Sequence, residues 1–131
     1  MSDALEANKA IARKYMDAVA AFDGATIMSL VAPDFKVITK GSSVLSGTRT
    51  LADLPALMEQ MAAKLDGPVT TEILGMMADG DRVAVEMEGE GKSVDGKAYN
   101  NQYLMILHIA DGKVHSMTEY MDTRLVDDVF G

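Results

Sequence analysis

The sequence predicts an α+β fold, in which helices in the first half of the chain precede an antiparallel sheet in the second half. Apolar residues up to position 65 recur at three- to four-residue steps, as on one face of a helix. Three Asp-Gly pairs, spaced sixteen residues apart, begin at Asp79, Asp95 and Asp111. Asp-Gly between alternating apolar runs indicates a hairpin, because glycine adopts a positive φ without steric cost.

The first helix is expected over 4–21, with an apolar face formed by Leu5, Ile11, Tyr15, Val19 and Phe22. A short second helix is expected over 24–31, because Asp23 can cap its start and the helix must stop before Pro33. A third helix has Asp53 as a possible N-cap, Pro55 in its first turn and Asp66-Gly67-Pro68 at its end. Its apolar face is Leu54, Leu57, Met58, Met61 and Leu65.

The strands come in two groups. A short strand over 35–39 and a Ser/Gly loop over 41–47 separate the second and third helices. Four further strands, at about 69–78, 81–91, 98–109 and 113–122, form a meander. The tail, 123–131, is expected to fray.

Each Asp-Gly turn allows two registers, which differ in the side chains that share a face. A two-residue turn pairs Ala110 with Lys113, whereas a three-residue loop with a glycine bulge pairs Ile109 with Lys113. With the bulge at every turn, Tyr103 lies between Met87 and Glu119 on a mostly apolar face. Apolar walls with a few convergent polar groups are typical of a ligand cavity.

The opposite face of the sheet combines a row of glutamates with apolar residues. Glu86, Glu88 and Glu90 are expected to be solvated. The apolar residues form a patch too large for a monomer to leave exposed, so we expect a homodimer through this outer sheet face. The patch consists of Leu74, Met76, Leu104, Ile106 and Tyr120.

Composition excludes several classes of function. At 131 residues the chain is expected to form one domain, over 1–131, and its net charge of −8 argues against binding to nucleic acid or an anionic membrane. It has no cysteine, hence no disulfide or thiolate chemistry. The N-terminus lacks a signal-peptide pattern, and no apolar run reaches the length of a membrane span, so we expect a cytoplasmic protein.

Several segments resemble the nuclear transport factor 2-like superfamily, over nearly the whole chain. ARKYMDAVAAFDGATIMSLVAPDFKV is similar to the opening of ketosteroid isomerase, and DGKVHSMTEYMDT is similar to the last hairpin of SnoaL-like proteins, which include polyketide cyclases. YNNQY followed by EYMDT resembles a subgroup described as ketosteroid isomerase-related. The resemblance implies a cone-shaped, cystatin-like fold, with a curved antiparallel sheet packed against three N-terminal helices.

The resemblance also distinguishes among the activities of that superfamily. Tyr15 matches the oxyanion-hole tyrosine of ketosteroid isomerase, but Thr39 stands at the position of its base, and 98–109 contains no carboxylate for a second oxyanion donor. Ketosteroid isomerase activity is therefore not expected. Glu119 matches the water-positioning aspartate of limonene epoxide hydrolase, whose other acid maps near Met87 and Gly89. SnoaL-like cyclases use one acidic base in an apolar pocket, which this chain can supply.

Glu119, Tyr15 and Tyr103 are the candidate catalytic residues. A carboxylate that faces an apolar cavity has a raised pKa and becomes a useful general base near neutral pH. The two phenols can donate to an oxyanion. Their alternative role is structural, with Glu119 hydrogen-bonded to Tyr15 or Tyr103.

The other candidates contact or orient the ligand. Asn101 can bind a ligand carbonyl or orient Glu119, and the pocket is expected to be shaped by Met61, Met87, Met105 and Met117. Both histidines are expected to be structural, with His108 facing outward and His115 on the face of Glu119, roughly 13 Å along the strand. No metal site or cofactor is expected.

Three functions remain open at this point. The first is a cofactor-independent isomerase, cyclase or hydrolase that acts on a small hydrophobic carbonyl compound or epoxide. The second is a non-catalytic module that binds a hydrophobic ligand. The third is an association domain that works as a dimer.

Overall fold

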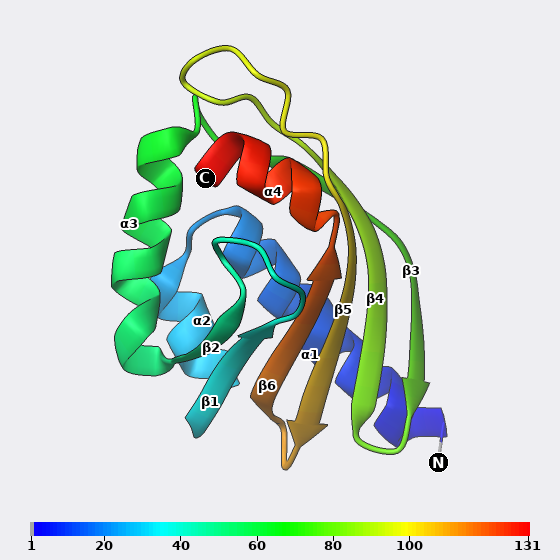
Figure 1. The fold of residues 1–131 in the computed structure, drawn as a ribbon. Coiled ribbons are helices and arrows are strands. Elements are labelled where there is room, and N and C mark those ends of the chain that lie inside the picture. The colour runs from blue at the N-terminus through cyan, green and yellow to red at the C-terminus, as the bar shows by residue number, and fades with distance from the viewer. Residues whose placement is uncertain (1) are drawn as a thin grey trace.

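The computed structural model describes residues 2–131 and contains four α-helices and six strands (Figure 1). The helices are α1 (Ser2–Ala20), α2 (Gly24–Leu30), α3 (Leu54–Lys64) and α4 (Thr123–Phe130), and a short 3₁₀ helix, η1 (Leu51–Asp53), precedes α3. The strands are β1 (Val31–Thr39), β2 (Gly47–Thr50), β3 (Thr70–Asp79), β4 (Arg82–Glu90), β5 (Gln102–Ala110) and β6 (Lys113–Met121).

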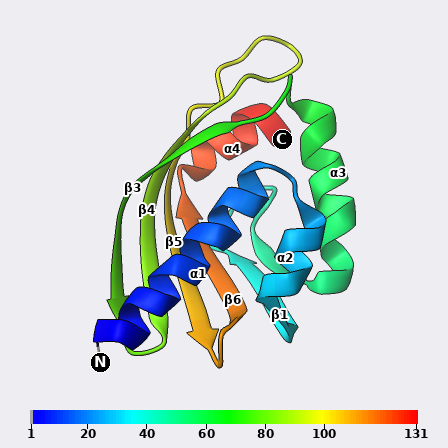
Figure 2. The same cartoon turned by 180° about the vertical axis from the view of Figure 1, so that it is seen from behind.

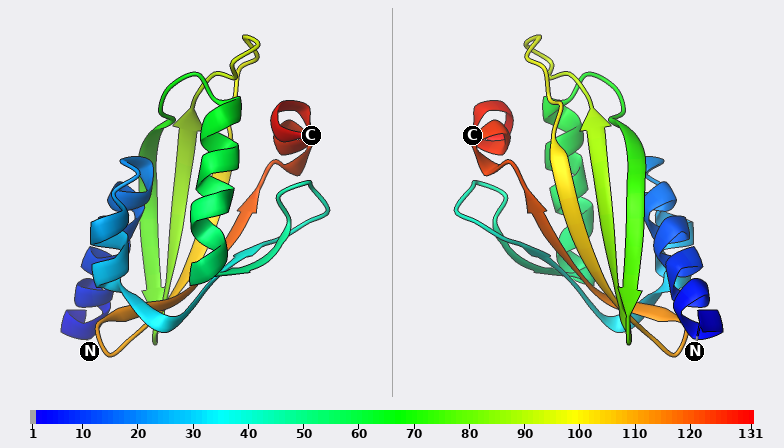
Figure 3. Two further views of the ribbon diagram at one scale, coloured as in Figure 1. Left: turned by 90° about the vertical axis from the view of Figure 1, so that its left-hand side faces the viewer. Right: turned by 90° about the vertical axis from the view of Figure 1, so that its right-hand side faces the viewer.

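All six strands form one sheet in the order β2-β1-β6-β5-β4-β3. Strands β3 to β6 form the predicted antiparallel meander, and β1 joins it in parallel to β6. The sheet is strongly curved (Figure 3). Seen from behind, α1 and α2 lie along one side of it, while α3 stands beside them and α4 lies across the top (Figure 2). This arrangement confirms the predicted α+β fold with a curved sheet.

Local sequence signals explain where the helices begin. Asp23 caps α2 as predicted, because its carboxylate accepts hydrogen bonds from the backbone N–H of Thr26 at 3.2 Å and from the Thr26 hydroxyl at 2.6 Å. Asp53 instead accepts from the backbone N–H of Thr50 at 2.9 Å and so fixes the turn into η1. Pro55 lies in the first turn of α3, where its missing N–H costs nothing.

Two ordered elements were not predicted. The loop predicted over 41–47 is present up to residue 46, and it leads into β2, which pairs antiparallel with β1. The tail predicted to fray forms α4, because Asp122 caps it at the backbone N–H of Arg124 and Leu125, at 3.1 and 3.2 Å. Val126 and Val129 of α4 are buried in a second apolar cluster with Leu65 and Tyr99. The ring of Phe130 meets Tyr99 edge-on at 5.1 Å.

In the first and last hairpins the offset lies in the strands rather than in the Asp-Gly turn, whereas at Asp95-Gly96 the register is that of the predicted three-residue loop, with Ser93 bonded to Lys97. In the last hairpin, Ile109 lies opposite Val114 but His108 lies opposite Ser116, so the extra residue is His115. Met87 is opposite Tyr103 as predicted, but Tyr103 does not lie opposite Glu119: it lies opposite Met121, and Glu119 lies opposite Met105 on the same face. A similar shift between Ile73 and Gly75 pairs Met76 with Val85 and packs Met76 against the core, which removes it from the predicted outer patch.

Candidate functional site

A cavity of ≈ 500 Å³ lies between the concave face of the sheet and helices α1, α2 and α3. Its walls are mostly apolar, contributed by the sheet on one side and by the helices on the other. Seven of the eight residues predicted to form the site line it: Tyr15, Met61, Met87, Tyr103, Met105, Met117 and Glu119. A smaller, polar hollow against β3, β4 and the start of β5 has neither the apolar walls nor Glu119, so the larger cavity is the candidate site.

Glu119 reaches the cavity from β6 and is held there by Thr39 of β1. The two residues are partners in the parallel ladder, and the Thr39 hydroxyl donates a hydrogen bond of 2.6 Å to Oε1 of Glu119. Burial among apolar walls raises the pKa of Glu119, because the charged form loses its hydration. The hydrogen bond from Thr39 and the positive charge of Arg49 partly oppose that rise in pKa.

Two of the three phenols that line the cavity are the predicted hydrogen-bond donors. Tyr15 projects from α1, packs against Phe35 at 5.7 Å between ring centroids, and has its pKa raised by burial and then by the charge of Glu119. Burial is also the largest cause that raises the pKa of Tyr103, followed by the neighbouring Tyr99 and by Glu119. Both phenols therefore stay protonated at neutral pH and can act as hydrogen-bond donors.

Glu119 and Tyr15 each have a side-chain oxygen that can still form a hydrogen bond with a ligand. Within residues 2–131, no fully buried side-chain nitrogen or oxygen lacks a hydrogen-bond partner. Among the side-chain hydrogen bonds of the same residues, one involves Oε1 of Glu119. None of them involves Oε2 of Glu119 or the Tyr15 hydroxyl. These two oxygens are therefore not sealed within protein and remain available to a ligand.

The structure does not bring Asn101 to the cavity, contrary to the expectation that it binds a ligand or orients Glu119. Its amide nitrogen donates to the Tyr99 hydroxyl and to the backbone oxygen of Asp122, both at 3.3 Å. Its amide oxygen accepts from the backbone N–H of Gln102 at 2.7 Å and of Asp122 at 3.0 Å. These contacts tie the start of β5 to the cap of α4, which gives Asn101 a structural role.

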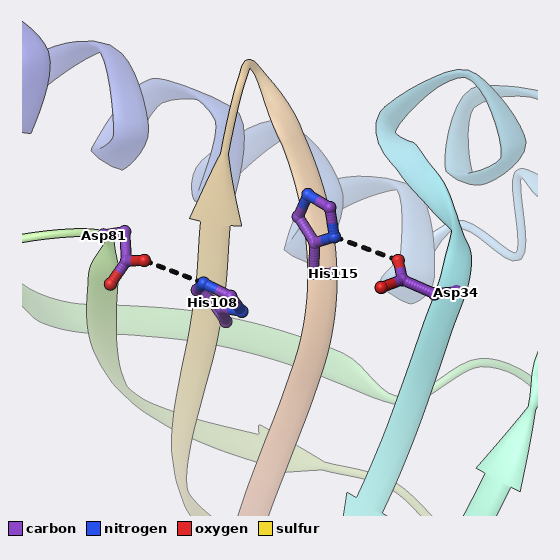
Figure 4. Close-up of polar contacts among 4 residues, drawn as sticks. All are labelled: Asp34, Asp81, His108 and His115. Atoms are coloured by element: carbon purple, nitrogen blue, oxygen red, sulfur yellow. Dashed lines mark hydrogen bonds and ion pairs between the residues drawn. The ribbon is translucent and has the colours of Figure 1, made fainter.

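Both histidines lie on the outer face of the sheet, away from Glu119 (Figure 4). His108 contacts Asp81 at 2.8 Å and His115 contacts Asp34 at 2.9 Å, with the two rings 5.4 Å apart. The expectation that His115 shares the face of Glu119 is wrong, because the shift at His115 turns its side chain outward. No group of three or more His, Cys, Asp or Glu in the described part of the chain could hold a metal ion.

Sequence reasoning missed the role of two residues at the site. The sequence indicated only that Thr39 stands at the position of the ketosteroid isomerase base. Its contact with Glu119 depends on the parallel pairing of β1 and β6. Tyr99 also lines the cavity. It falls within the strand predicted over 98–109, but β5 begins only at Gln102, so Tyr99 lies in the connection before that strand. The alternation of β1 could have indicated that Thr39 faces inward, because buried Val37 and Phe35 precede it at two-residue steps.

No helix within residues 2–131 combines the length and the apolar character needed to cross a membrane.

Comparison with known proteins supports the fold. A cystatin-like protein from Xanthomonas campestris is 26% identical and superposes with a TM-score of 0.75, covering 95% of this chain and 98% of its own. An NTF2-like protein from Burkholderia xenovorans is 23% identical, with a TM-score of 0.78 and coverage of 97% and 98%. TerC, crystallised with polyporic acid, is 21% identical, with a TM-score of 0.82 and coverage of 95% and 98%.

No curated protein sequence matches the chain. Residues 12–117, however, match the sequence model of the SnoaL-like domain. The protein therefore belongs to the SnoaL-like domain family, within the nuclear transport factor 2-like superfamily.

Proposed function

We propose that the protein is a cofactor-independent isomerase, cyclase or hydrolase that acts on a small hydrophobic molecule with a carbonyl group or an epoxide. One observation carries this proposal. Glu119 is the sole Asp, Glu, His, Lys or Arg among the described residues that line the cavity, and the phenols of Tyr15 and Tyr103 accompany it there. A lone carboxylate with a raised pKa in an apolar pocket is suited to general-base catalysis near neutral pH.

For a carbonyl substrate, the proposed step is proton transfer at the carbon next to the carbonyl group. Oε2 of Glu119 takes the proton, and the electron pair of the broken C–H bond forms an enolate with its charge on the carbonyl oxygen. The hydroxyls of Tyr15 and Tyr103, both in the cavity lining, donate hydrogen bonds to that oxygen. Protonated Glu119 then returns the proton to another carbon of the substrate. In a cyclisation, the enolate carbon instead bonds to a second carbonyl carbon of the substrate, and the alkoxide oxygen that forms takes the proton from Glu119. With an epoxide, ionised Glu119 takes a proton from a water molecule whose oxygen bonds to an epoxide carbon, the C–O bond of the ring breaks, and the resulting alkoxide takes the proton from Glu119.

The ligand is proposed to be uncharged with one polar end. The cavity lining among the described residues holds no Lys, Arg or His to neutralise an anion, and Glu119 would repel one. The apolar walls favour a hydrophobic body, while the polar groups of Glu119, Tyr15 and Tyr103 favour a single carbonyl, hydroxyl or epoxide oxygen. TerC, a protein of similar fold, was crystallised with polyporic acid, so a protein of this fold can take up an organic molecule.

The test uses a panel of hydrophobic ketones in deuterated water, with exchange at the carbon next to the carbonyl followed by NMR. Glu119→Gln keeps the size of the side chain and removes the base, so exchange should fall at least about 100-fold while ligand affinity persists. Glu86→Gln on the outer face is the matched control and should behave like the unmodified protein. Undiminished exchange in Glu119→Gln would rule Glu119 out. A parallel panel of epoxides, assayed for diol formation, tests the hydrolase arm.

A non-catalytic binding module is the second candidate. It is favoured by the incomplete set of acids: Thr39 takes the place of the ketosteroid isomerase base, and β5 carries no carboxylate. Binding of panel compounds without exchange or hydrolysis would support it. An association domain without a ligand is less well supported, because a cavity of ≈ 500 Å³ is larger than the voids of a closed core.

We also propose that the outer sheet face pairs two copies of the chain. Leu74, Leu104 and Tyr120 are 49%, 40% and 43% exposed there, which is a high exposure for large apolar side chains on one sheet.

A further inference from the structure

We propose that Thr39 is a positioning residue that gives the two carboxylate oxygens of Glu119 different tasks. Oε1 is held by the Thr39 hydroxyl, and Oε2 is left to take the proton of the substrate. This inference rests on the proposed function, because it specifies how Glu119 acts as the base.

The backbone fixes both residues before the side chains meet. Thr39 and Glu119 are direct partners in the parallel ladder, and the backbone N–H of Lys40 donates to the carbonyl oxygen of Glu119 at 3.0 Å. Thr39 is 4% exposed, and a β-branched side chain has few rotamers in a strand. The hydroxyl therefore has a set location, and its bond of 2.6 Å to Oε1 restricts rotation of the carboxylate.

The contact selects one oxygen of the carboxylate. Among residues 2–131, Thr39 is the side chain that hydrogen-bonds to Glu119, and it contacts Oε1. Oε2 is not sealed away, since no fully buried polar side-chain atom of these residues lacks a partner. A carboxylate held by one oxygen presents the other in a constant direction, and such orientation is what a base needs for repeated proton transfer.

The hydrogen bond also affects the charge state of Glu119. Desolvation favours the protonated acid, which cannot act as a base, whereas a donated hydrogen bond stabilises the carboxylate. The other groups that interact with this carboxylate are Arg49 of β2, whose charge also favours ionisation, and the phenols of Tyr15, Tyr99 and Tyr103, whose own pKa values it raises. Thr39 is thus the neutral group that keeps Glu119 both oriented and ionisable.

The experiment follows the carboxyl signal of Glu119 by NMR of isotope-labelled protein during a pH titration, with Glu119→Gln used to identify the signal. Thr39→Val preserves the shape of the side chain and removes the donor, so the midpoint of Glu119 should move to higher pH. Thr39→Ser restores a hydroxyl and should return the midpoint most of the way. Thr118→Val, the same change on the opposite face of β6, should leave it unmoved.

A second readout applies once the ketone panel yields a substrate. In Thr39→Val, kcat/KM at about neutral pH should fall roughly tenfold, with the acidic limb of the pH profile displaced in step with the NMR midpoint and KM little changed. A folded Thr39→Val protein with an unchanged midpoint would overturn the proposal. If that variant does not fold, Thr39→Ala with an unchanged midpoint would do the same.

These outcomes are separable from failure of the proposed function. Full exchange activity in Glu119→Gln removes Glu119 as the base whatever Thr39 does. Conversely, an unmoved midpoint in Thr39→Val removes the positioning role and leaves Glu119 as the base.

Discussion

The hairpin of β5 and β6 carries a hydrogen-bonded carboxyl group on each of its faces, and the pKa values of the two carboxyl groups are shifted in opposite directions. On the inner face, Glu119 accepts from Thr39 at 2.6 Å, and burial raises the pKa of that carboxyl. On the outer face, Asp81 meets His108 at 2.8 Å, and this hydrogen bond lowers the pKa of the Asp81 carboxyl. The distances are similar, so the environment and not the contact length decides in which direction the pKa of each carboxyl is shifted.

One inserted residue separates the two faces. His115 is the extra residue of the hairpin, and beyond it the strands place Met117 and Glu119 inside while Ser116 and Thr118 face outward. Without that shift, the residues of β6 that follow His115 would lie on the opposite face of the sheet. The bulge thus determines that Glu119 lies in the cavity.

The largest expected difference between the faces is in packing. Leu107 is fully buried on the inner face of β5, whereas Leu104 of the same strand is 40% exposed on the outer face. Leu107→Ala should lower the free energy of unfolding by about 3 kcal/mol, because it leaves a cavity in the core. Leu104→Ala should change it by less than about 1 kcal/mol. Urea denaturation of both variants measures the difference, and equal losses would contradict it.

The second prediction tests whether the outer face is covered by another copy. Leu104→Asp places a charge in the proposed contact and should weaken self-association by about 100-fold. Sedimentation velocity over a range of concentrations measures this effect. Val94→Asp is the control, since Val94 is 62% exposed but lies in the connection between β4 and β5. A monomer at every concentration for the unmodified chain would end the dimer proposal.

The sequence predicted the meander and the inner face well, because hydrophobic alternation and Asp-Gly turns are local signals. Met87 lies opposite Tyr103 as predicted, and Glu119 shares their face, although it lies opposite Met105 rather than Tyr103. In the first and last hairpins the extra residues are Leu74 and His115 and do not lie in the turns. Met76 and His115 were placed on the wrong face for that reason, since a bulge inside a strand has no characteristic dipeptide.

Contacts between distant segments were not predictable in the same way. The parallel pairing of β1 with β6 joins residues eighty positions apart and leaves no periodic signal, so the contact between Thr39 and Glu119 could not be inferred. Helix α4 was missed although its apolar residues fall on one face, because a helix of eight residues is not stable on its own and depends on packing against Tyr99 and Leu65. Asn101 was misassigned because its partners, Tyr99 and the backbone of Asp122, belong to that same docked end.

The third prediction concerns how the stability of the inner face depends on pH. Since the pKa of Glu119 is raised on folding, the folded state binds more protons than the unfolded state between the two pKa values, and stability falls as pH rises through that window. Glu119→Gln removes the buried charge and should be more stable than the unmodified protein by about 1 kcal/mol at about pH 8. This gain should vanish in acid, where Glu119 is protonated in both states.

Denaturation curves at several pH values measure that gain, and Glu86→Gln controls for the loss of one negative charge on the exposed face. A gain of the same size in both variants would assign it to net charge instead of burial. A constant gain at all pH values would show that ionisation of Glu119 is not its cause.

The smallest effect is expected for the outer pair. Asp81 is exposed and its pKa is lowered by His108, so any stability that it contributes is present above its unfolded pKa and is lost as pH falls through the folded pKa. Solvent screens this pair, so the free energy of unfolding of Asp81→Asn should be close to that of the unmodified protein at neutral pH and equal to it in acid. Asp34→Asn makes the matched change beside His115. If either variant lost as much free energy of unfolding as Leu107→Ala, the outer pairs would stabilise the fold as strongly as the core does. The two faces would then differ only in the pKa shifts of their carboxyl groups.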